Sequence, residues 1–103
     1  MMDFSDALRA AKAGKKIARE GWNGKGLWVA LTPGSIILLA QARNPGAANH
    51  LRKEKLNWNE ESPLVEHITI LPHLDMKAAD GSLVIGWLAS QTDLLAEDWE
   101  VLP

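Results

Sequence analysis

Residues 74 to 87 read LDMKAADGSLVIGW, and this stretch is the clearest β-hairpin signal in the chain. The dipeptide Asp80-Gly81 stands between two runs of alternating apolar residues and favours the backbone angles of a tight turn. The alternation predicts one face that carries the apolar side chains of both strands, namely Leu74, Met76, Ala78, Leu83, Ile85 and Trp87. The expected fold therefore starts from an antiparallel hairpin.

Further strands and one helix are expected around this hairpin. Phe4, Leu8 and Ala11 recur at helical spacing, which predicts a helix over residues 4–13 that ends before Gly14. The expected strands are KKIAREGW (15–22), LWVAL (27–31), SIILLAQA (35–42), VEHITIL (65–71) and WEVL (99–102). The segment NGKG (23–26) predicts a tight turn between the first two of them. Residues 43–63 are expected to form a mobile surface excursion with a helical turn around residues 47–56.

The expected fold class is α+β, a small antiparallel sheet with an N-terminal helix and a short C-terminal helical turn. The 103 residues correspond to a single ligand-binding domain over residues 1–103. A net charge of -2 argues against a dedicated DNA-binding protein, which would carry a basic face. The absence of cysteine excludes disulfides and thiolate metal sites. No stretch resembles a signal peptide or a membrane span, so we expect a cytoplasmic protein with no membrane partner.

The segment SQTD, residues 90 to 93, matches the Ser-x-x-Asp form of a helix-capping box. In this interpretation the Ser90 hydroxyl accepts from a backbone N–H, and the Asp93 carboxylate accepts from the Ser90 amide. This structural role explains Ser90 and Asp93 but leaves Gln91 and Thr92 unexplained. A helix N-terminus close to Trp87 can also present N–H groups to an anion or to the edge of a base.

Five tryptophans accompany one phenylalanine and no tyrosine, an unusual excess. An indole combines a flat stacking face with one N–H donor, so it suits both cores and planar ligands. Trp22 precedes the expected turn and either covers the sheet edge or forms a platform for adenine. Trp28 lines a recess or packs on the second face, whereas Trp87 is expected mainly in the core. Trp99 is expected in the core or in an interface, and Trp58 receives no assignment.

Two blocks of the sequence resemble a known family. ALRAAKAGKKIAREGWNGKGLWVAL and MKAADGSLVIGWLASQTDLLAEDWEVL are similar to the signature blocks of Thoeris anti-defence proteins of the second type, which are small phage and prophage proteins. The resemblance covers residues 4–31 and 70–102. It implies a non-enzymatic sponge that sequesters a cyclic ADP-ribose isomer, glycocyclic ADP-ribose, made by bacterial TIR immunity proteins. It also implies a homotetramer with recesses between protomers, and cyclic di- or trinucleotides as further ligands of some members.

With this resemblance, Trp22 becomes the first choice for a ligand contact. The full set of candidate ligand-binding residues is Trp22, Asn23, Lys25, Trp28, Trp87, Ser90, Gln91, Thr92 and Asp93. The Asp93 carboxylate can accept from ribose hydroxyls, and a glutamine amide can read an adenine edge. A pyrophosphate needs cationic partners, and the candidates are Lys25, Arg19 and Lys77. We favour Lys25, because the glycines on both sides allow a close approach of the backbone.

Catalysis and metal binding find no positive support in the sequence. His50, His67 and His73 lack the spacing of a zinc motif, so surface or hydrogen-bonded roles are the simpler interpretation. Neither a phosphate-binding loop nor a nucleophile motif is present, and no cofactor is expected. Two alternatives remain open beside the sponge. One is a hydrolase of the same nucleotide signal, and the other is an assembly protein whose indoles only seal subunit contacts.

Overall fold

The structure is a computed structural model that describes residues 1–42, 46–55 and 67–103. The chain divides into two compact units, one formed by residues 1–33 and 72–103 and the other by residues 34–71. Trp58, the predicted excursion at residues 43–45 and 56–63, and the start of the predicted strand 65–71 lie outside the described residues. Within the described part of the chain, no helix is long and apolar enough to cross a membrane.

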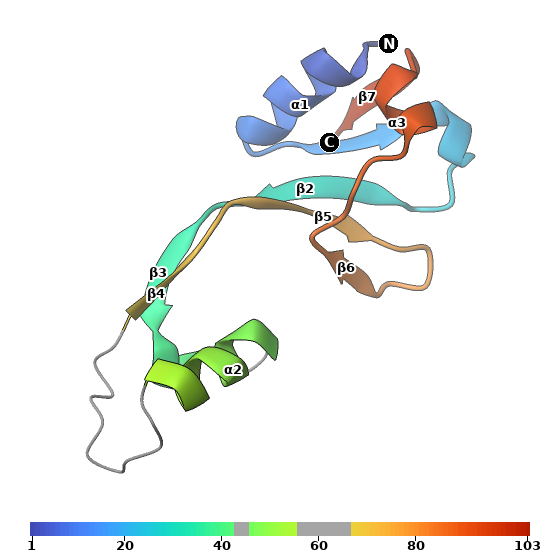
Figure 1. The fold of residues 1–103 in the computed structure, drawn as a ribbon. Coiled ribbons are helices and arrows are strands. Elements are labelled where there is room, and N and C mark those ends of the chain that lie inside the picture. Colours follow the sequence, from blue (N-terminus) through green and yellow to red (C-terminus); the bar gives the residue numbers. More distant parts are fainter. Residues whose placement is uncertain (43–45, 56–66) are drawn as a thin grey trace. The chain divides into compact units, whose positions relative to one another are not determined.

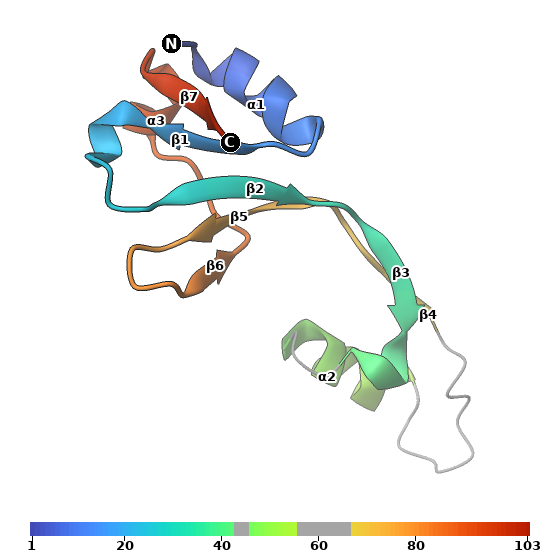
Figure 2. The same cartoon turned by 180° about the vertical axis from the view of Figure 1, so that it is seen from behind.

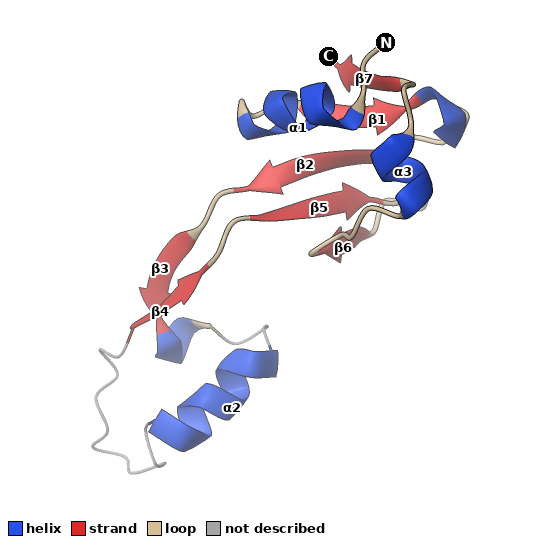
Figure 3. Cartoon of the chain, turned by 45° about the horizontal axis from the view of Figure 1, so that its top comes forward, coloured by secondary structure: helices blue, strands red, loops and turns tan. Residues whose placement is uncertain are grey.

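The first unit is a five-stranded antiparallel sheet with helices α1 and α3 beside it (Figure 1). The strand order is β6-β5-β2-β1-β7, so β6 and β7 form the two edges. In chain order its elements are α1 (Phe4–Lys12), β1 (Lys16–Arg19), η1 (Glu20–Trp22), β2 (Trp28–Thr32), β5 (His73–Lys77), β6 (Leu83–Ile85), α3 (Gln91–Leu95) and β7 (Trp99–Leu102). The predicted α+β class is therefore confirmed, including the N-terminal helix and the short C-terminal helix (Figure 3).

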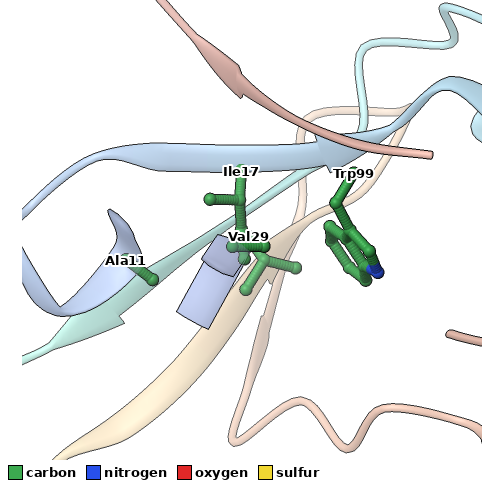
Figure 4. Packing of buried hydrophobic residues seen from close by; sticks show 5 residues of the cluster. Ala11, Ile17, Val29 and Trp99 are labelled. Atoms are coloured by element: carbon green, nitrogen blue, oxygen red, sulfur yellow. The ribbon is translucent and has the colours of Figure 1, made fainter. Parts of the chain in front are cut away.

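Helix α1 and one face of the sheet enclose the core of this unit. The Asp3 carboxylate accepts from the Asp6 amide and begins the helix. The helix then packs two alanines against the sheet, where small side chains allow a close approach. The fully buried side chains of the cluster are Ala7, Ala11, Ile17, Val29 and Trp99 (Figure 4). Because Trp99 comes from β7 and Val29 from β2, the core ties together strands that are distant in sequence.

The predicted hairpin forms, but the predicted pairing of its strands is wrong by one residue. The Ala78 amide donates to the Ser82 carbonyl, and Gly81 adopts a φ of 92°, so the loop holds one residue more than a two-residue turn. Met76 consequently pairs with Val84, and Leu83 and Ile85 lie on the opposite face from the core. A slip of one residue exchanges the two faces of a strand.

A second irregularity at Gly86 reverses this slip. Gly86 has a φ of 78°, and its amide donates to the Asp75 carboxylate at 3.0 Å. The next amide, that of Trp87, donates to the Leu74 carbonyl at 2.7 Å. The extra residue behaves as a β-bulge, which turns the following side chain back to the other face. Trp87 therefore packs against the core as expected, although Leu83 and Ile85 do not.

The link between β1 and β2 is wider than the predicted tight turn. Strand β1 ends at Arg19, and residues Glu20–Trp22 form a single turn of 3-10 helix instead of continuing the strand. Asn23 then adopts a left-handed conformation with a φ of 58°, which asparagine tolerates better than most residues. The two strands still pair antiparallel, with Ile17 opposite Val29. The wide connection is visible beyond the end of β1 in Figure 2.

The second unit contains strands β3 (Ser35–Leu38) and β4 (His67–Ile70), which pair antiparallel. The 3-10 helix η2 (Leu39–Gln41) ends the predicted strand over residues 35–42 early. Helix α2 (Gly46–Lys55) occupies the region where a helical turn was predicted. The small core of this second unit consists of Leu39, Ala42 and Ala48.

Candidate functional site

Four aromatic rings form a cluster at the end of the sheet in the first unit. The Trp22 ring centroid lies 5.3 Å from that of Trp99 and 6.2 Å from that of Trp87, both at steep edge-to-face angles. Phe4 from α1 contacts Trp99 on another side at 5.3 Å. Such edge-to-face pairs are favourable beyond their area burial. The early connection and the segment before α3 therefore meet within one protomer.

A hollow of about 390 Å³ opens beside Trp22. Its walls are the end of β1 at Ala18 and Arg19, Glu20 and Trp22 of η1, residues 24–27 of the wide connection, and Glu100 and Leu102 of β7. The glycines at positions 24 and 26 both have positive φ values, so the chain can bend tightly around Lys25. The volume lies within the range of small-molecule sites. The hollow therefore combines an indole, aliphatic side chains and a cation in one place.

The charges around the hollow are mixed. Arg19 and Lys25 contribute positive charges, and Glu20 and Glu100 contribute negative ones. Of the three cations predicted for a pyrophosphate, Arg19 is bound by carboxylates, and Lys77 donates to the Gly26 carbonyl at 2.6 Å. For Lys25, the described residues show no side-chain hydrogen bond or ion pair. Lys25 is therefore the cation best placed to meet an anionic group.

Arg19 is at the centre of an ion-pair network that the sequence analysis missed. Its Nε donates to Asp98 at 2.8 Å, and its Nη1 donates to Asp93 at 2.8 Å. The hydrogen bond from Arg19 lowers the pKa of Asp98, and the two aspartates raise the pKa of Arg19. For Asp93, burial opposes ionisation, but hydrogen bonds from Arg19 and Ser90 outweigh it and lower the pKa. All three groups therefore remain charged at neutral pH.

The capping box at the start of α3 is confirmed. The Ser90 hydroxyl accepts from the Asp93 amide at 3.1 Å, and the Asp93 carboxylate accepts from the Ser90 amide at 3.2 Å. The Asp93 carbonyl also accepts from the Trp99 indole N–H at 2.9 Å. Gln91 and Thr92 are exposed in the first turn. None of these four residues lines the hollow, so the structure does not place α3 in its wall.

The remaining predicted residues are distributed around this site. Asn23 is exposed at the end of η1, where its backbone N–H donates to the Glu20 carbonyl at 2.9 Å. Trp28 is half-buried on the face of the sheet opposite the core, with the Lys16 ammonium 5.5 Å from its ring centroid. The structure thus brings Trp22 and Lys25 together in the hollow and places Trp87 against Trp22. Asn23, Trp28 and Trp87 are not among the residues that line the hollow.

Glu100 and Leu102 are wall residues that sequence reasoning did not select. They lie opposite Ala18 and Lys16 in the β1–β7 pairing, on the face away from Trp99. Their alternation with Trp99 and Val101 was a usable signal, because a buried Trp99 places its neighbours on the other face. What the pattern could not supply was the pairing of β7 with β1 across most of the chain length.

The sequence matches the family described as the Thoeris anti-defense 2-like domain over residues 2–102. The chain belongs to this family. It is also similar to the protein named Thoeris anti-defense 2 of Bacillus phage SP01, with 31% identity over 101 residues. That alignment covers 98% of this chain and 94% of the phage protein.

Proposed function

We propose that this protein counteracts Thoeris immunity as a molecular sponge, which binds a cyclic ADP-ribose isomer and holds it without cleaving it. The observation that carries the proposal is the hollow beside Trp22, where Trp22 and Lys25 line the same space. Membership of the Thoeris anti-defense 2-like family supports the biological role. Glycocyclic ADP-ribose is the proposed ligand, and the host cytoplasm, where TIR proteins make it, is the proposed location.

The groups in the hollow match the chemistry of such a ligand. Stacking of a base on an aromatic side chain contributes about 1–3 kcal/mol, and Trp22 is half-buried and lines the hollow. The Lys25 ammonium offers a counter-charge for the pyrophosphate. The carboxylates of Glu20 and Glu100 can accept hydrogen bonds from ribose hydroxyls. The hollow therefore provides one partner for each part of an ADP-ribose ring.

A sponge succeeds by mass action. It must be abundant, and its affinity must exceed that of the immune effector; nanomolar binding corresponds to about -12 kcal/mol. A small charged ligand reaches this affinity only in a pocket that is formed before binding. The edge-to-face contacts of Trp22 with Trp87 and Trp99 support such preorganisation, because they restrict the indole before a ligand arrives.

We also propose that the protein assembles into a homotetramer, with ligand recesses completed between protomers. The support lies in apolar side chains that one chain leaves in solvent. Leu83 is 59%, Ile85 is 65% and Leu88 is 89% exposed. Strand β6 is also an edge strand without charge or proline, the features with which monomeric proteins protect an edge. A second copy of the chain would cover this surface.

A thermal-shift panel of ADP-ribose isomers and cyclic di- and trinucleotides tests the proposal, followed by titration calorimetry with the best ligand. Trp22→Ala should weaken binding by about tenfold to a hundredfold, the range that the loss of one stacked base predicts. Trp28→Ala is the matched control, because Trp28 lies outside the hollow, and it should change affinity less than threefold. No stabilisation by any member of the panel, or equal effects of both variants, would contradict the proposed site.

The exposed apolar surface also favours a second candidate, an assembly protein without a nucleotide ligand. It predicts that no nucleotide raises the melting temperature. In that case Trp22→Ala would change the molar mass measured by light scattering more than it changes any binding signal. The same panel, run with light scattering on each variant, therefore separates the two functions.

A further inference from the structure

Asp98 holds the start of the connection that carries Trp22. Its carboxylate accepts from the Gly21 amide at 2.8 Å, and from Arg19 Nε at 2.8 Å and Nη2 at 3.4 Å. Its backbone carbonyl accepts from the Glu20 amide at 3.0 Å. Glu20 and Gly21 are the first two residues of η1, the turn that ends at Trp22. Asp98, the residue just before β7, thus fixes the two backbone amides at the start of the turn that leads to the hollow.

Gly21 is fitted closely to this arrangement. A Cβ atom at this position would lie 2.8 Å from Asp98 Oδ2 and 3.2 Å from Arg19 Nη2. Each atom is the end of a side chain and takes part in the ion pair between the two, so a Cβ here would push the carboxylate and the guanidinium away from η1. A glycine therefore lets the backbone approach the carboxylate without displacing this ion pair.

The network also reaches the opposite side of the aromatic cluster. Arg19 Nη1 donates to Asp93, whose carboxylate caps α3 and whose carbonyl accepts from the Trp99 indole. The side chains of Arg19, Asp93 and Asp98 are only 16%, 14% and 26% exposed. By contrast, the ion pair of Arg9 and Asp6 on α1 is 71% and 50% exposed, which is typical of pairs that contribute little.

We propose that Arg19 and Asp98 are positioning residues, a clamp that fixes the path of residues 20–22 and thereby holds Trp22 at the rim of the hollow. The effect that the clamp should have on ligand affinity rests on the proposed function. The effect of the clamp on the position of Trp22 does not depend on that function. An asparagine at position 98 cannot replace the aspartate, because its amide group would face a donor on either Arg19 or Gly21. The clamp therefore requires the carboxylate.

Near-ultraviolet circular dichroism tests the clamp without a ligand, because closely packed indoles give a signal that depends on their mutual orientation. Trp22→Phe defines the share of the signal that Trp22 contributes. Asp98→Asn should remove most of that share while the far-ultraviolet spectrum stays unchanged. Asp6→Asn, which breaks the exposed ion pair on α1, is the control and should leave the signal intact. A wild-type near-ultraviolet spectrum for Asp98→Asn would overturn the proposal.

Gly21→Ala provides a second perturbation in case Asp98→Asn does not fold. It retains both members of the ion pair but forces them away from the rim, so the Trp22 signal should fall as well. Gly46→Ala is its control, since a Cβ there meets no atom within 4 Å. An unchanged signal for Gly21→Ala would show that the position of Trp22 does not depend on the close approach of Gly21 to Asp98, and would overturn the clamp.

A double-mutant cycle extends the test to the ligand. Asp98→Asn should reduce affinity about tenfold in the wild-type background but less than twofold in the Trp22→Phe background, because a clamp acts through Trp22. Equal reductions in both backgrounds would assign Asp98 a general structural role and overturn the positioning claim. If the wild-type protein binds no nucleotide, the proposed function fails, and the circular dichroism result still decides whether the clamp exists.

Discussion

The two faces of the five-stranded sheet differ sharply in how they treat apolar side chains. On the face covered by α1, Ile17, Val29 and Trp99 are completely buried. On the opposite face, Leu83 and Ile85 are exposed, although the sequence groups them in one alternating run with Leu74, Met76 and Trp87, which pack against the core. The difference arises from two glycines that shift the register of one strand. Alternation in a sequence therefore establishes that a strand has two faces, but not which face meets the core.

The largest expected effect comes from making the same substitution on both faces. Ile17→Ala should lower the free energy of unfolding by about 2–5 kcal/mol, because it leaves a cavity in a fully buried position. Ile85→Ala should change the stability of the protomer by less than about 0.5 kcal/mol, because the side chain is exposed. Urea unfolding at a concentration where the protein is monomeric measures both. Equal losses would contradict the assigned faces.

Gly86→Ala tests the β-bulge that follows β6 and returns Trp87 to the core face. Gly86 has a φ of 78°, a conformation that costs a residue with a Cβ about 1–2 kcal/mol. We expect a loss of stability of this size in urea unfolding. Trp87 should also lose order, because the bulge returns it to the core face, and its contact with Trp22 should show this in the near-ultraviolet spectrum. An unstrained Gly86→Ala variant with wild-type stability would contradict the bulge.

A smaller effect on stability is expected when the pH is lowered, because the ion pairs of Asp93 and Asp98 with Arg19 are then lost. The folded pKa values of Asp98 and Asp93 are lowered below the ordinary value of 3.8. Their contribution to stability is therefore fully present above that value and is lost as the pH falls through the folded pKa values. The difference in urea midpoint between wild type and Asp98→Asn should shrink from pH 6 toward pH 3. A difference that stays constant over this range would contradict the charged network.

Local patterns predicted much of the fold. The spacing of Phe4, Leu8 and Ala11 predicted α1, and Ser90 with Asp93 predicted the cap of α3. Each of these features depends on residues three or four positions apart. The pattern also predicted that Trp87 and Trp99 belong to the core, and both lie there.

The features that were missed depend on contacts between distant residues or on single loop residues. Arg19 and Asp98 are 79 positions apart, so no local spacing reveals their ion pair. The extra loop residue before Ser82 changed the register of β6, because turn length and not side-chain pattern sets the pairing. Glu100 and Leu102 entered the wall of the hollow only through the pairing of β7 with β1.

Recovery of the bound ligand tests the central claim most directly. The protein would be incubated with a stoichiometric amount of glycocyclic ADP-ribose, separated from free ligand, heat-denatured and analysed by chromatography with mass detection. Sequestration at the Trp22 hollow predicts that unchanged ligand is released by the wild-type protein and that Trp22→Ala retains little of it. A new product peak would identify a hydrolase instead, and ligand that passes through unbound would contradict a sponge.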